Sequence, residues 1–499
     1  MQTDFSRIKI FLISLICIAI LILPQNIFSQ DKKDNVPDET KSINLVNNYL
    51  SVLNSGNKDS MQNFVTHHFD ENFLKRFPLF NLVTFCMSTW YQSGGMGYQL
   101  VEIFPTRQNV ISAELLNKLT NCNVMLRIPV SETSSCKIRG LIETKINTSN
   151  PDRNSEKDIG IKNLVAKLDI CLKKLEADSE FSGTVIVAKG GKPLVSKAIS
   201  EANKSWHIPN RIDTKFNLAS VGKIFTGLAV VQLAEKGLLT FDDTIDKYIS
   251  KDWLNPGVSR KIQVKHLLTH TSGLGDYFRK AYNQCEIPYF RELEDYKSLI
   301  ANDTLLFEPG SGFSYSNTGM LLLGVVIEKV THEKYFDYLK NNIFLPAGMM
   351  NTGGYSKDRP ADNLATGYTK LFENGEITWD SHLYTRVMKG SPSGGVYSTA
   401  EDLLKFEEAL KSGKLVSPGF LNFLLEGKPE LNASFHSYGF FTGNGDKGIE
   451  LSHSGDGSGV NCWFKIYYDA GYTCIVLSNY SPPSAGIVSG VIEQLISKI

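Results

Sequence analysis

The chain has 499 residues, of which 42% are hydrophobic and 21% charged, a composition typical of globular proteins and enough for more than one domain. Lysine and arginine together number 52, and aspartate and glutamate also number 52. This balance excludes the strongly basic surface typical of nucleic-acid-binding proteins, and so no nucleic-acid partner is expected.

The N-terminus has the pattern of an export signal. Arg7 and Lys9 precede the apolar run 10–23, Pro24 ends the run, and Ser29 offers a small residue for cleavage. This run of fourteen residues, apolar except for Ser14, fits a signal peptide better than a membrane span, which needs about twenty. We predict a signal peptide over residues 1–30 and a secreted or periplasmic protein. The alternative is an uncleaved signal that anchors the protein to the membrane through residues 10–23.

A small domain is expected between the signal and a polar linker. The segment 148–158 is polar and carries Pro151, which predicts a linker. Residues 40–147 show helical periodicity first and strand-like runs later, over 97–104, 124–129 and 138–146. Helices followed by strands predict a small α+β domain. It resembles the cone-shaped domains of the nuclear-transport-factor-2-like superfamily.

Residues 159–499 predict a larger α/β domain. A helix is expected over 161–175, and Gly190-Gly191 then separates two β-branched runs, which predicts a hairpin. The chain reads as mainly helical over 219–350, returns to strands that turn near Ala470-Gly471, and ends in a helix over 485–499. This order predicts an antiparallel sheet flanked by terminal helices, with an all-α subdomain inserted.

No metal site is predicted. No C-x-x-C pair occurs, and the widely spaced cysteines are expected to be buried and unreactive. His266 and His270 lie four residues apart, a spacing that can bind a metal on a helix, but no glutamate stands at the second position of this pair.

The first candidate for chemistry is Ser220-Val221-Gly222-Lys223. The same Ser-x-x-Lys spacing occurs at Ser6, Ser29, Ser55 and Ser134, but here it opens an apolar run with helical period. Residues three apart on a helix share a face, and so Lys223 can lie beside the Ser220 hydroxyl. A buried lysine loses its charge easily and can take the serine proton. The alternative is a serine N-cap with a solvated lysine.

Tyr315 and Asn317 form the second candidate, in the stretch FEPGSGFSYSNTGM before an apolar helix predicted over 320–330. A phenol beside a lysine cation is expected to lose its proton more readily and to relay it. The Asn317 amide offers donors and an acceptor to a substrate amide. The alternative is that Asn317 only caps the helix.

The third candidate is His453-Ser454-Gly455-Asp456, in the stretch HSGDGSGV that leads into the last hairpin. A glycine here allows a substrate to approach a strand edge closely. The Asp456 N–H is then expected to be an oxyanion donor beside the Ser220 N–H. The alternative is a flexible glycine turn.

Taken together and in this order, the three motifs resemble those of the penicillin-recognising serine hydrolases. The chain is similar to their class C β-lactamase-like branch, which includes penicillin-binding proteins, esterases and D-peptidases. The resemblance covers residues 160–499 and extends to further phrases: LLTHTSGL (267–274), FEPGSGFSYSNTGMLLLG (307–324), IFLPAGM (343–349) and SGGVYSTAEDLLKF (393–406).

The resemblance implies a β-lactamase/transpeptidase-like fold and a role for each motif residue. Ser220 is the acylated nucleophile, Lys223 and Tyr315 share the acid–base work, and Asn317 holds the substrate amide or the Lys223 ammonium. His453 stands where typical β-lactamases have lysine, a departure that weighs against β-lactamase activity.

The function expected from this resemblance is an exported serine hydrolase that needs no metal or organic cofactor. Its substrates would be esters, amides or short peptides with D-residues, including peptidoglycan fragments. The alternatives are a β-lactamase or D-Ala-D-Ala carboxypeptidase, and a non-catalytic protein that binds peptidoglycan or a partner.

Overall fold

The computed structural model describes residues 39–107, 109–131, 136–145, 160–278, 280–373, 376–383, 385 and 387–499. The predicted signal peptide (1–30) and linker (148–158) lie outside these residues, and both stay predictions. The chain forms two compact units. The first contains the residues up to Phe181 together with Pro482–Ile499, and the second contains Ser182–Ser481.

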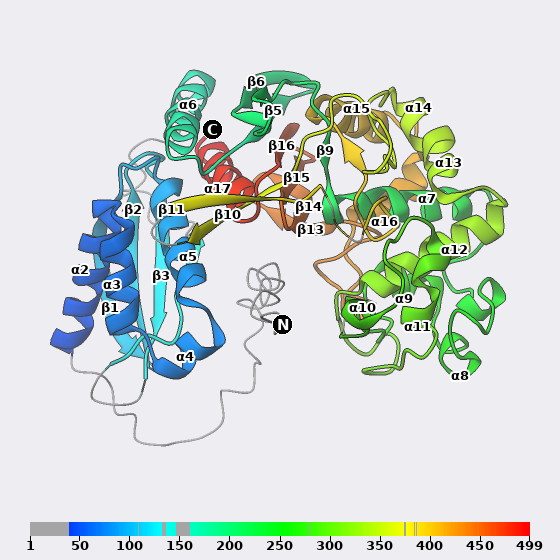
Figure 1. Ribbon diagram of the computed structural model, residues 1–499, viewed down its shortest axis with the longest axis horizontal. Coiled ribbons are helices and arrows are strands. Elements are labelled where there is room, and N and C mark those ends of the chain that lie inside the picture. The colour runs from blue at the N-terminus through cyan, green and yellow to red at the C-terminus, as the bar shows by residue number, and fades with distance from the viewer. Residues whose placement is uncertain are drawn as a thin grey trace, which may run out of the picture. The chain divides into compact units, whose positions relative to one another are not determined.

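In the first unit, helices precede strands in the predicted α+β order. The helices are α2 (Glu39–Ser55), α3 (Lys58–His68), α4 (Glu71–Arg76) and α5 (Leu79–Gln92). The strands form an antiparallel sheet in the order β1 (Tyr98–Arg107), β2 (Val110–Asn117), β3 (Asn123–Pro129) and β4 (Ile142–Lys145). Helix α2 packs against β1, and α3 packs against α2 and α5 (Figure 1). The strand predicted over 138–146 begins only at Ile142, because Ile138 makes isolated bridges with Phe69 and Val130 instead.

The predicted helices α6 (Gly160–Ala177) and α17 (Ser484–Ile496) belong to the first unit, where both pack against α5. Buried polar groups join α17 to the turn between β2 and β3. The Gln494 Oε1 atom accepts hydrogen bonds from Asn117 Nδ2 at 3.0 Å and Thr120 Oγ1 at 2.7 Å. Cys122 Sγ donates to the Gln494 carbonyl at 3.2 Å. The last helix of the chain therefore shares a core with the N-terminal segment.

The second unit is built on a six-stranded antiparallel sheet in the order β13-β14-β15-β16-β5-β6. Its strands are β5 (Gly183–Lys189), β6 (Lys192–Ile199), β13 (Phe441–Gly445), β14 (Gly448–Gly457), β15 (Val460–Tyr467) and β16 (Tyr472–Ser478). Both predicted hairpins are confirmed. Gly190 and Gly191 make the first turn with φ angles of 55° and 72°, in the left-handed region that glycine adopts without strain. The second hairpin turns between Tyr467 and Tyr472.

Short paired strands complete the second unit: β7 (Glu201–Asn203), β8 (Ile208–Pro209), β9 (Phe216–Asn217), β10 (Tyr368–Glu373), β11 (Glu376–Ser381) and β12 (Tyr397–Ser398). The predicted helical region is also confirmed. Its main elements are the 3₁₀ turn η4 (Ala219–Gly222), α7 (Lys223–Glu235), α8 (Pro256–Ser259), α9 (Val264–Leu268), α10 (Lys280–Gln284), α11 (Lys297–Ile300), α12 (Asn317–Thr331), α13 (Tyr335–Leu339) and α14 (Leu345–Ala347). Helices α15 (Ala400–Lys411) and α16 (Pro418–Leu425) follow, and α15 packs on β5 and β16.

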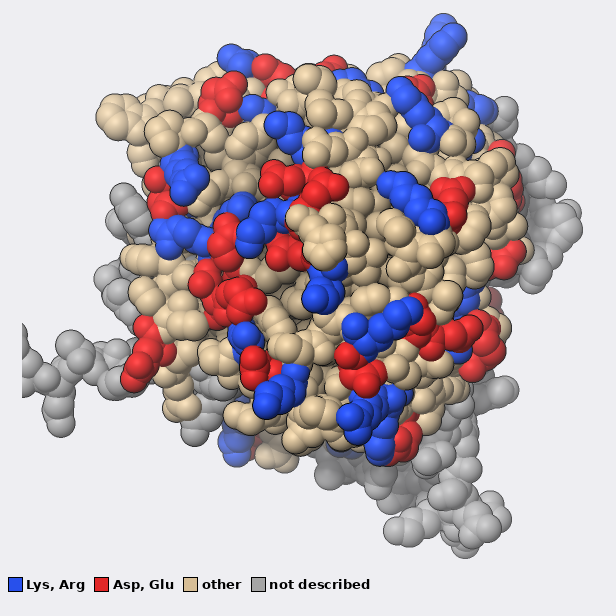
Figure 2. All heavy atoms as spheres, turned by 90° about the vertical axis from the view of Figure 1, so that its right-hand side faces the viewer, with Lys and Arg blue, Asp and Glu red and all other residues tan. Residues whose placement is uncertain are grey.

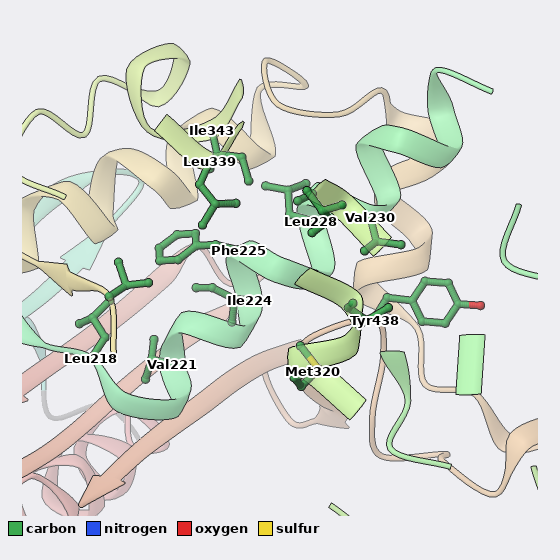
Figure 3. Packing of buried hydrophobic residues seen from close by; sticks show 14 of the residues in the cluster. Leu218, Val221, Ile224, Phe225, Leu228, Val230, Met320, Leu339, Ile343 and Tyr438 are labelled. Carbon is green, nitrogen blue, oxygen red and sulfur yellow. The ribbon is translucent and has the colours of Figure 1, made fainter. Parts of the chain in front are cut away.

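Helix α7 is the centre of this unit's core. Every residue from Lys223 to Leu233 is buried, because α7 has apolar residues on all its faces. Figure 3 shows Val221, Ile224 and Phe225 leaving the first turns in different directions. The Phe225 ring meets Phe344 and Phe406 edge-on, each with its ring centre 5.1 Å away. The residues that open α7 are thus held by packing on every side.

The surface carries both signs of charge. Figure 2 shows lysine, arginine, aspartate and glutamate intermixed over the helical part of the second unit. The seven cysteines in the described ranges are free, and all except Cys285 are buried, as the sequence predicts. None of the helices described is long and apolar enough to cross a membrane.

A substitution at Gln494 tests whether its buried hydrogen bonds stabilise the first unit. Gln494→Leu leaves the Thr120 hydroxyl without its acceptor in a buried place, and so unfolding should become easier by about 1–3 kcal/mol. The melting temperature of the purified protein measures this loss. Asn163→Ala, at an exposed position of α6, is the matched control and should leave it unchanged. Equal melting temperatures for Gln494→Leu and the parent would contradict the structural role of these bonds.

Candidate active site

Ser220 lies on the 3₁₀ turn η4. The sequence predicts an α-helix that begins at Ser220, but in the structure this helix begins at Lys223. Residues three apart eclipse one another on a 3₁₀ turn, and so this geometry brings Ser220 and Lys223 closer together than an α-helical turn would. The preceding Ala219 has a φ of 42°, which is strained for a residue with a Cβ. Its N–H donates to Asn217 Oδ1 and its carbonyl accepts from the Gly395 N–H, which holds the strained turn in place. The Ser220 side chain stays partly exposed.

Lys223 is fully buried and its amine meets the nucleophile. The Nζ atom donates to Ser220 Oγ at 2.9 Å and to the carbonyl oxygen of Ser393, and it lies 4.8 Å from the centre of the Tyr315 ring. Burial lowers the pKa of Lys223 to about 7, and the nearby Asp276 carboxylate acts in the opposite direction. A substantial fraction of Lys223 is therefore neutral at pH 7 and able to accept a proton from Ser220.

Tyr315 lies beside Ser220 and Lys223 with its proton firmly held. Burial raises its pKa, a side-chain hydrogen bond with Ser220 opposes the rise, and the Asp276 and Asp456 carboxylates add to it. Burial is the largest of these influences and favours the neutral phenol, while the expectation that Lys223 makes Tyr315 easier to deprotonate stays a prediction. The phenol is poised to donate a proton rather than to accept one.

Asn317 is the first residue of α12, while Ser316 is the N-cap and accepts from the Gly319 N–H. The alternative that Asn317 only caps the helix is therefore wrong. Its Nδ2 donates to Asp276 Oδ2 at 2.7 Å, and its backbone N–H donates to the same oxygen at 3.3 Å. A hydrogen bond from Asn317 to Lys223 is absent from the described structure, and the roles predicted for Asn317 stay predictions.

His453 lies on β14 and is 2% exposed. Its Nδ1 atom is 2.6 Å from the Ser454 carbonyl, and so Nδ1 carries the proton and donates it. Its ring lies 6.5 Å from that of Tyr315 and 5.4 Å from that of Phe441. Burial and the positive charge of Lys223 lower the pKa of His453 to about 3. The residue that replaces the family lysine is thus a neutral imidazole at pH 7.

A further histidine, His270, packs against Tyr315, and His436 packs against His270. His270 accepts the Ser316 N–H at Nδ1 and has its ring centre 4.4 Å from that of Tyr315. His436 lies 4.8 Å from His270, is fully buried, and finds no partner for either ring nitrogen among the described residues. Burial lowers the pKa values of both histidines, that of His436 to about 4. The two histidine rings nearest to Tyr315 among these contacts, His270 and His453, are therefore neutral imidazoles.

Gly455 is where β14 approaches the nucleophile turn. A Cβ added at Gly455 would overlap the Leu218 carbonyl oxygen and crowd the Ala219 side chain. The glycine therefore lets the strand lie against the turn that carries Ser220, and the predicted close approach of a substrate stays a prediction. This juxtaposition supports the pairing of the Ser220 and Asp456 N–H groups as oxyanion donors, which stays a prediction.

The structure adds residues that the motifs did not indicate. Ser393 supplies the carbonyl that Lys223 binds, and its hydroxyl meets Tyr277 Oη at 2.7 Å and Ser391 Oγ at 2.8 Å. Asp276 binds Asn317 and opposes the loss of charge on Lys223. Ser393 opens the phrase SGGVYSTAEDLLKF and Asp276 follows LLTHTSGL by two residues, and so both lay close to a signal already noted.

The histidine pair considered for a metal has other partners. His266 Nδ1 accepts the Gln263 N–H at 3.1 Å within the capping of α9, and His270 binds Ser316. Across the described ranges, no group of three histidine, cysteine, aspartate or glutamate side chains could hold a metal ion.

The contact between Gly455 and the nucleophile turn can be tested. Gly455→Ala forces two backbones apart, and a displacement of about 1 Å can slow a reaction about a hundredfold. We therefore expect Ser220 to react about a hundredfold more slowly with a fluorophosphonate probe. Gly443→Ala, on β13 of the same sheet, is the control because its added Cβ meets nothing within 4 Å. Labelling of Gly455→Ala at the rate of the control would show that the contact does not position Ser220.

Comparisons with known proteins agree on the fold and the family. A penicillin-binding protein of Bacillus subtilis (strain 168) is 32% identical over 325 residues, which cover 62% of this chain and 71% of that protein. Protein flp of Staphylococcus aureus (strain N315) is 27% identical over 328 residues, and the match spans 62% of its length, less than two thirds.

Solved structures match over the same region. A penicillin-binding protein from Bacillus halodurans is 31% identical with a TM-score of 0.58, covering 65% of this chain and 98% of that one. The D-amino acid amidase of Ochrobactrum anthropi SV3 is 22% identical with a TM-score of 0.55, and the match covers 68% of this chain and 98% of that one. At this level of identity the similarity shows the fold alone. The predicted β-lactamase/transpeptidase-like fold, with a separate N-terminal region, is confirmed. The family model described as Beta-lactamase matches residues 169–491, well over half of the chain, and the protein therefore belongs to the β-lactamase family.

Proposed function

We propose that this protein is an exported serine hydrolase that forms an acyl-enzyme on Ser220 and transfers the acyl group to water. The observation that carries the proposal is the 2.9 Å contact between Ser220 Oγ and the buried Lys223 amine. A serine hydroxyl becomes an effective nucleophile when a neighbouring base takes its proton. A lysine whose pKa burial lowers to about 7 is such a base near neutral pH.

Acylation follows from the positions of three side chains. Neutral Lys223 takes the Ser220 proton as Oγ attacks the substrate carbonyl, and the Ser220 and Asp456 N–H groups stabilise the oxyanion. Tyr315, whose pKa is raised by burial, keeps its phenolic proton until the leaving group departs and then donates it. The Lys223 ammonium returns its proton to the phenolate. Water later attacks the acyl-enzyme, with the same groups exchanging protons in the reverse direction.

The substrates proposed are esters, amides or short peptides that contain D-residues, such as peptidoglycan fragments. Structural neighbours of the same fold include EstCE1, described as a hydrolase with promiscuous acyltransferase activity, and the D-amino acid amidase. The buried, neutral His453 weighs against β-lactams, because a neutral imidazole attracts a carboxylate far less than a lysine cation does.

The two alternatives to this proposal predict different results in assays of activity and of labelling. A β-lactamase or D-Ala-D-Ala carboxypeptidase would hydrolyse nitrocefin or a D-Ala-D-Ala peptide in preference to p-nitrophenyl esters and D-amino-acid amides. A non-catalytic binder of peptidoglycan or of a partner would leave a fluorophosphonate probe unreacted. The contact between Lys223 and Ser220 favours an enzyme over a binder, because a binding protein needs no base at its serine.

Export is proposed from the signal pattern over residues 1–30, which directs the chain to the periplasm or the medium. Membrane attachment through residues 10–23 would follow if the signal is not cleaved. N-terminal sequencing of the protein purified from the medium, the periplasm or the membrane distinguishes these outcomes.

The assignment of the nucleophile is tested by Ser220→Ala. Turnover of p-nitrophenyl acetate should fall by at least about a thousandfold, because the attacking oxygen is removed. The free energy of unfolding should change by only about 1 kcal/mol, since Lys223 keeps its bond to Ser393. Ser55→Ala is the control because Ser55 is the exposed first residue of another Ser-x-x-Lys, and it should keep full activity. Turnover by Ser220→Ala at the parent rate would show that another group is the nucleophile.

The pH dependence tests Lys223 as the base. A base works only when it is deprotonated, and so kcat/KM for an uncharged ester should fall as the pH drops below about 7. Asp276→Asn removes the carboxylate that opposes the lowered pKa of Lys223, which should move the midpoint of this fall to a lower pH. Stopped-flow acylation rates between pH 5 and pH 9 measure both midpoints. A midpoint that moves upward in Asp276→Asn would contradict Lys223 as the titrating group.

A further inference from the structure

Asp456 occupies the part of β14 that has a neighbour on one side only. β13 pairs with β14 from Gly448 to Ser452 and then ends. The next residues of β14, from His453 to Gly457, pair with β15 and with no other described strand. On this free stretch Gly455 lies against the Leu218–Ala219 backbone that leads into Ser220. The Asp456 side chain is thus attached one residue from the contact between the sheet and the nucleophile turn.

The negative charge of the Asp456 carboxylate is balanced by few neighbouring groups. Its Oδ1 atom accepts a hydrogen bond from Asn461 Nδ2 at 2.6 Å, and neither of its oxygens forms an ion pair with any lysine, arginine or histidine in the described ranges. Asp276, the other carboxylate near Ser220, differs in this respect. It accepts two bonds from Asn317 and lies close enough to Lys223 to stabilise its charge. The lysine in the site therefore already has its counter-charge in Asp276.

A lone carboxylate at this position opposes the proposed reaction. Attack by Ser220 places negative charge on the substrate oxygen, and a nearby anion raises the energy of that charge in a partly buried site. The carboxylate's field reaches the catalytic groups, because Asp456 contributes to the raised pKa of Tyr315. Burial raises the pKa of Asp456 to about 6, which still leaves most of it ionised at neutral pH. A positive charge supplied by the substrate would remove this penalty.

We propose that Asp456 recognises a primary ammonium group of the substrate, close to the scissile carbonyl, and that the preferred substrates are amides or esters of amino acids with a free amino group. This inference rests on the proposed function and names the substrate class of the same site. The neutral His453 next to it fits the same class, because it offers no cation to a substrate carboxylate. The backbone groups of β14 can still bind the substrate's amide, since the strand edge is free there.

Paired substrates test the proposal. We compare D-alanine p-nitroanilide, which carries the ammonium, with N-acetyl-D-alanine p-nitroanilide, which does not. Asp456→Asn keeps the shape, the backbone N–H and an acceptor for Asn461 while it removes the charge. The ratio of the two kcat/KM values at pH 7 should fall about tenfold in this variant, or about 1.4 kcal/mol. Asp469→Asn, at the β15–β16 turn of the same sheet, removes an equal charge and should leave the ratio unchanged. A ratio in Asp456→Asn equal to that of the parent overturns the proposal.

A binding experiment separates this inference from the hydrolase proposal. D-Alanine amide is titrated by calorimetry into Ser220→Ala and into Ser220→Ala/Asp456→Asn. About tenfold weaker binding to the second variant supports recognition by Asp456, even if the parent enzyme hydrolyses neither anilide. Equal affinities, or no binding to Ser220→Ala, overturn it. Failure of the parent to hydrolyse any ester or amide, with a fluorophosphonate probe unreacted, contradicts the hydrolase proposal alone.

Discussion

The burial of the Lys223 amine is the constraint on which the candidate site depends. Lys223 is the first residue of α7, a helix buried on all sides, and so its side chain has no route to solvent. The amine is instead held by Ser220 Oγ, the Ser393 carbonyl and the face of the Tyr315 ring. Burial makes the charged form costly and brings the neutral form within reach at pH 7, while Asp276 keeps the pKa from falling further. Packing of the core thus sets the chemistry of the lysine.

The position of Ser220 depends on two glycines far apart in the sequence. A Cβ at Gly455 would overlap the Leu218 carbonyl, and a Cβ at Gly394 would overlap the Ala219 carbonyl and crowd the Ser220 nitrogen. The strained turn at Ala219 is therefore pressed between β14 and the segment after Ser393. The strain persists because backbone groups on both sides leave the turn no other conformation. Such a turn holds its hydroxyl still, as a nucleophile requires.

The compact units do not follow the limits of the family match. The match runs from 169 to 491, beginning inside α6 and ending inside α17, yet both helices pack with α5 in the first unit. The buried bonds of Gln494 with Asn117 and Thr120 add polar specificity to that packing. The N-terminal segment therefore packs against two helices that belong largely to the region matched by the family. We infer that the first unit needs these two helices in order to fold.

The sequence by itself determined the family, the order of elements and the pairing of Ser220 with Lys223. Periodicity, glycine turns and three-residue spacing are local properties, and they predict α6, α7, α12, α17 and both hairpins within a few residues. Tertiary structure alone decided the rest, because burial and contacts between distant segments have no local signal. It buried Tyr315, which raises the pKa of the phenol, and it bound Asn317 to Asp276. It also left the Asp456 carboxylate without an ion pair among the residues that the structure describes, since only the folded sheet shows which side chains reach that strand.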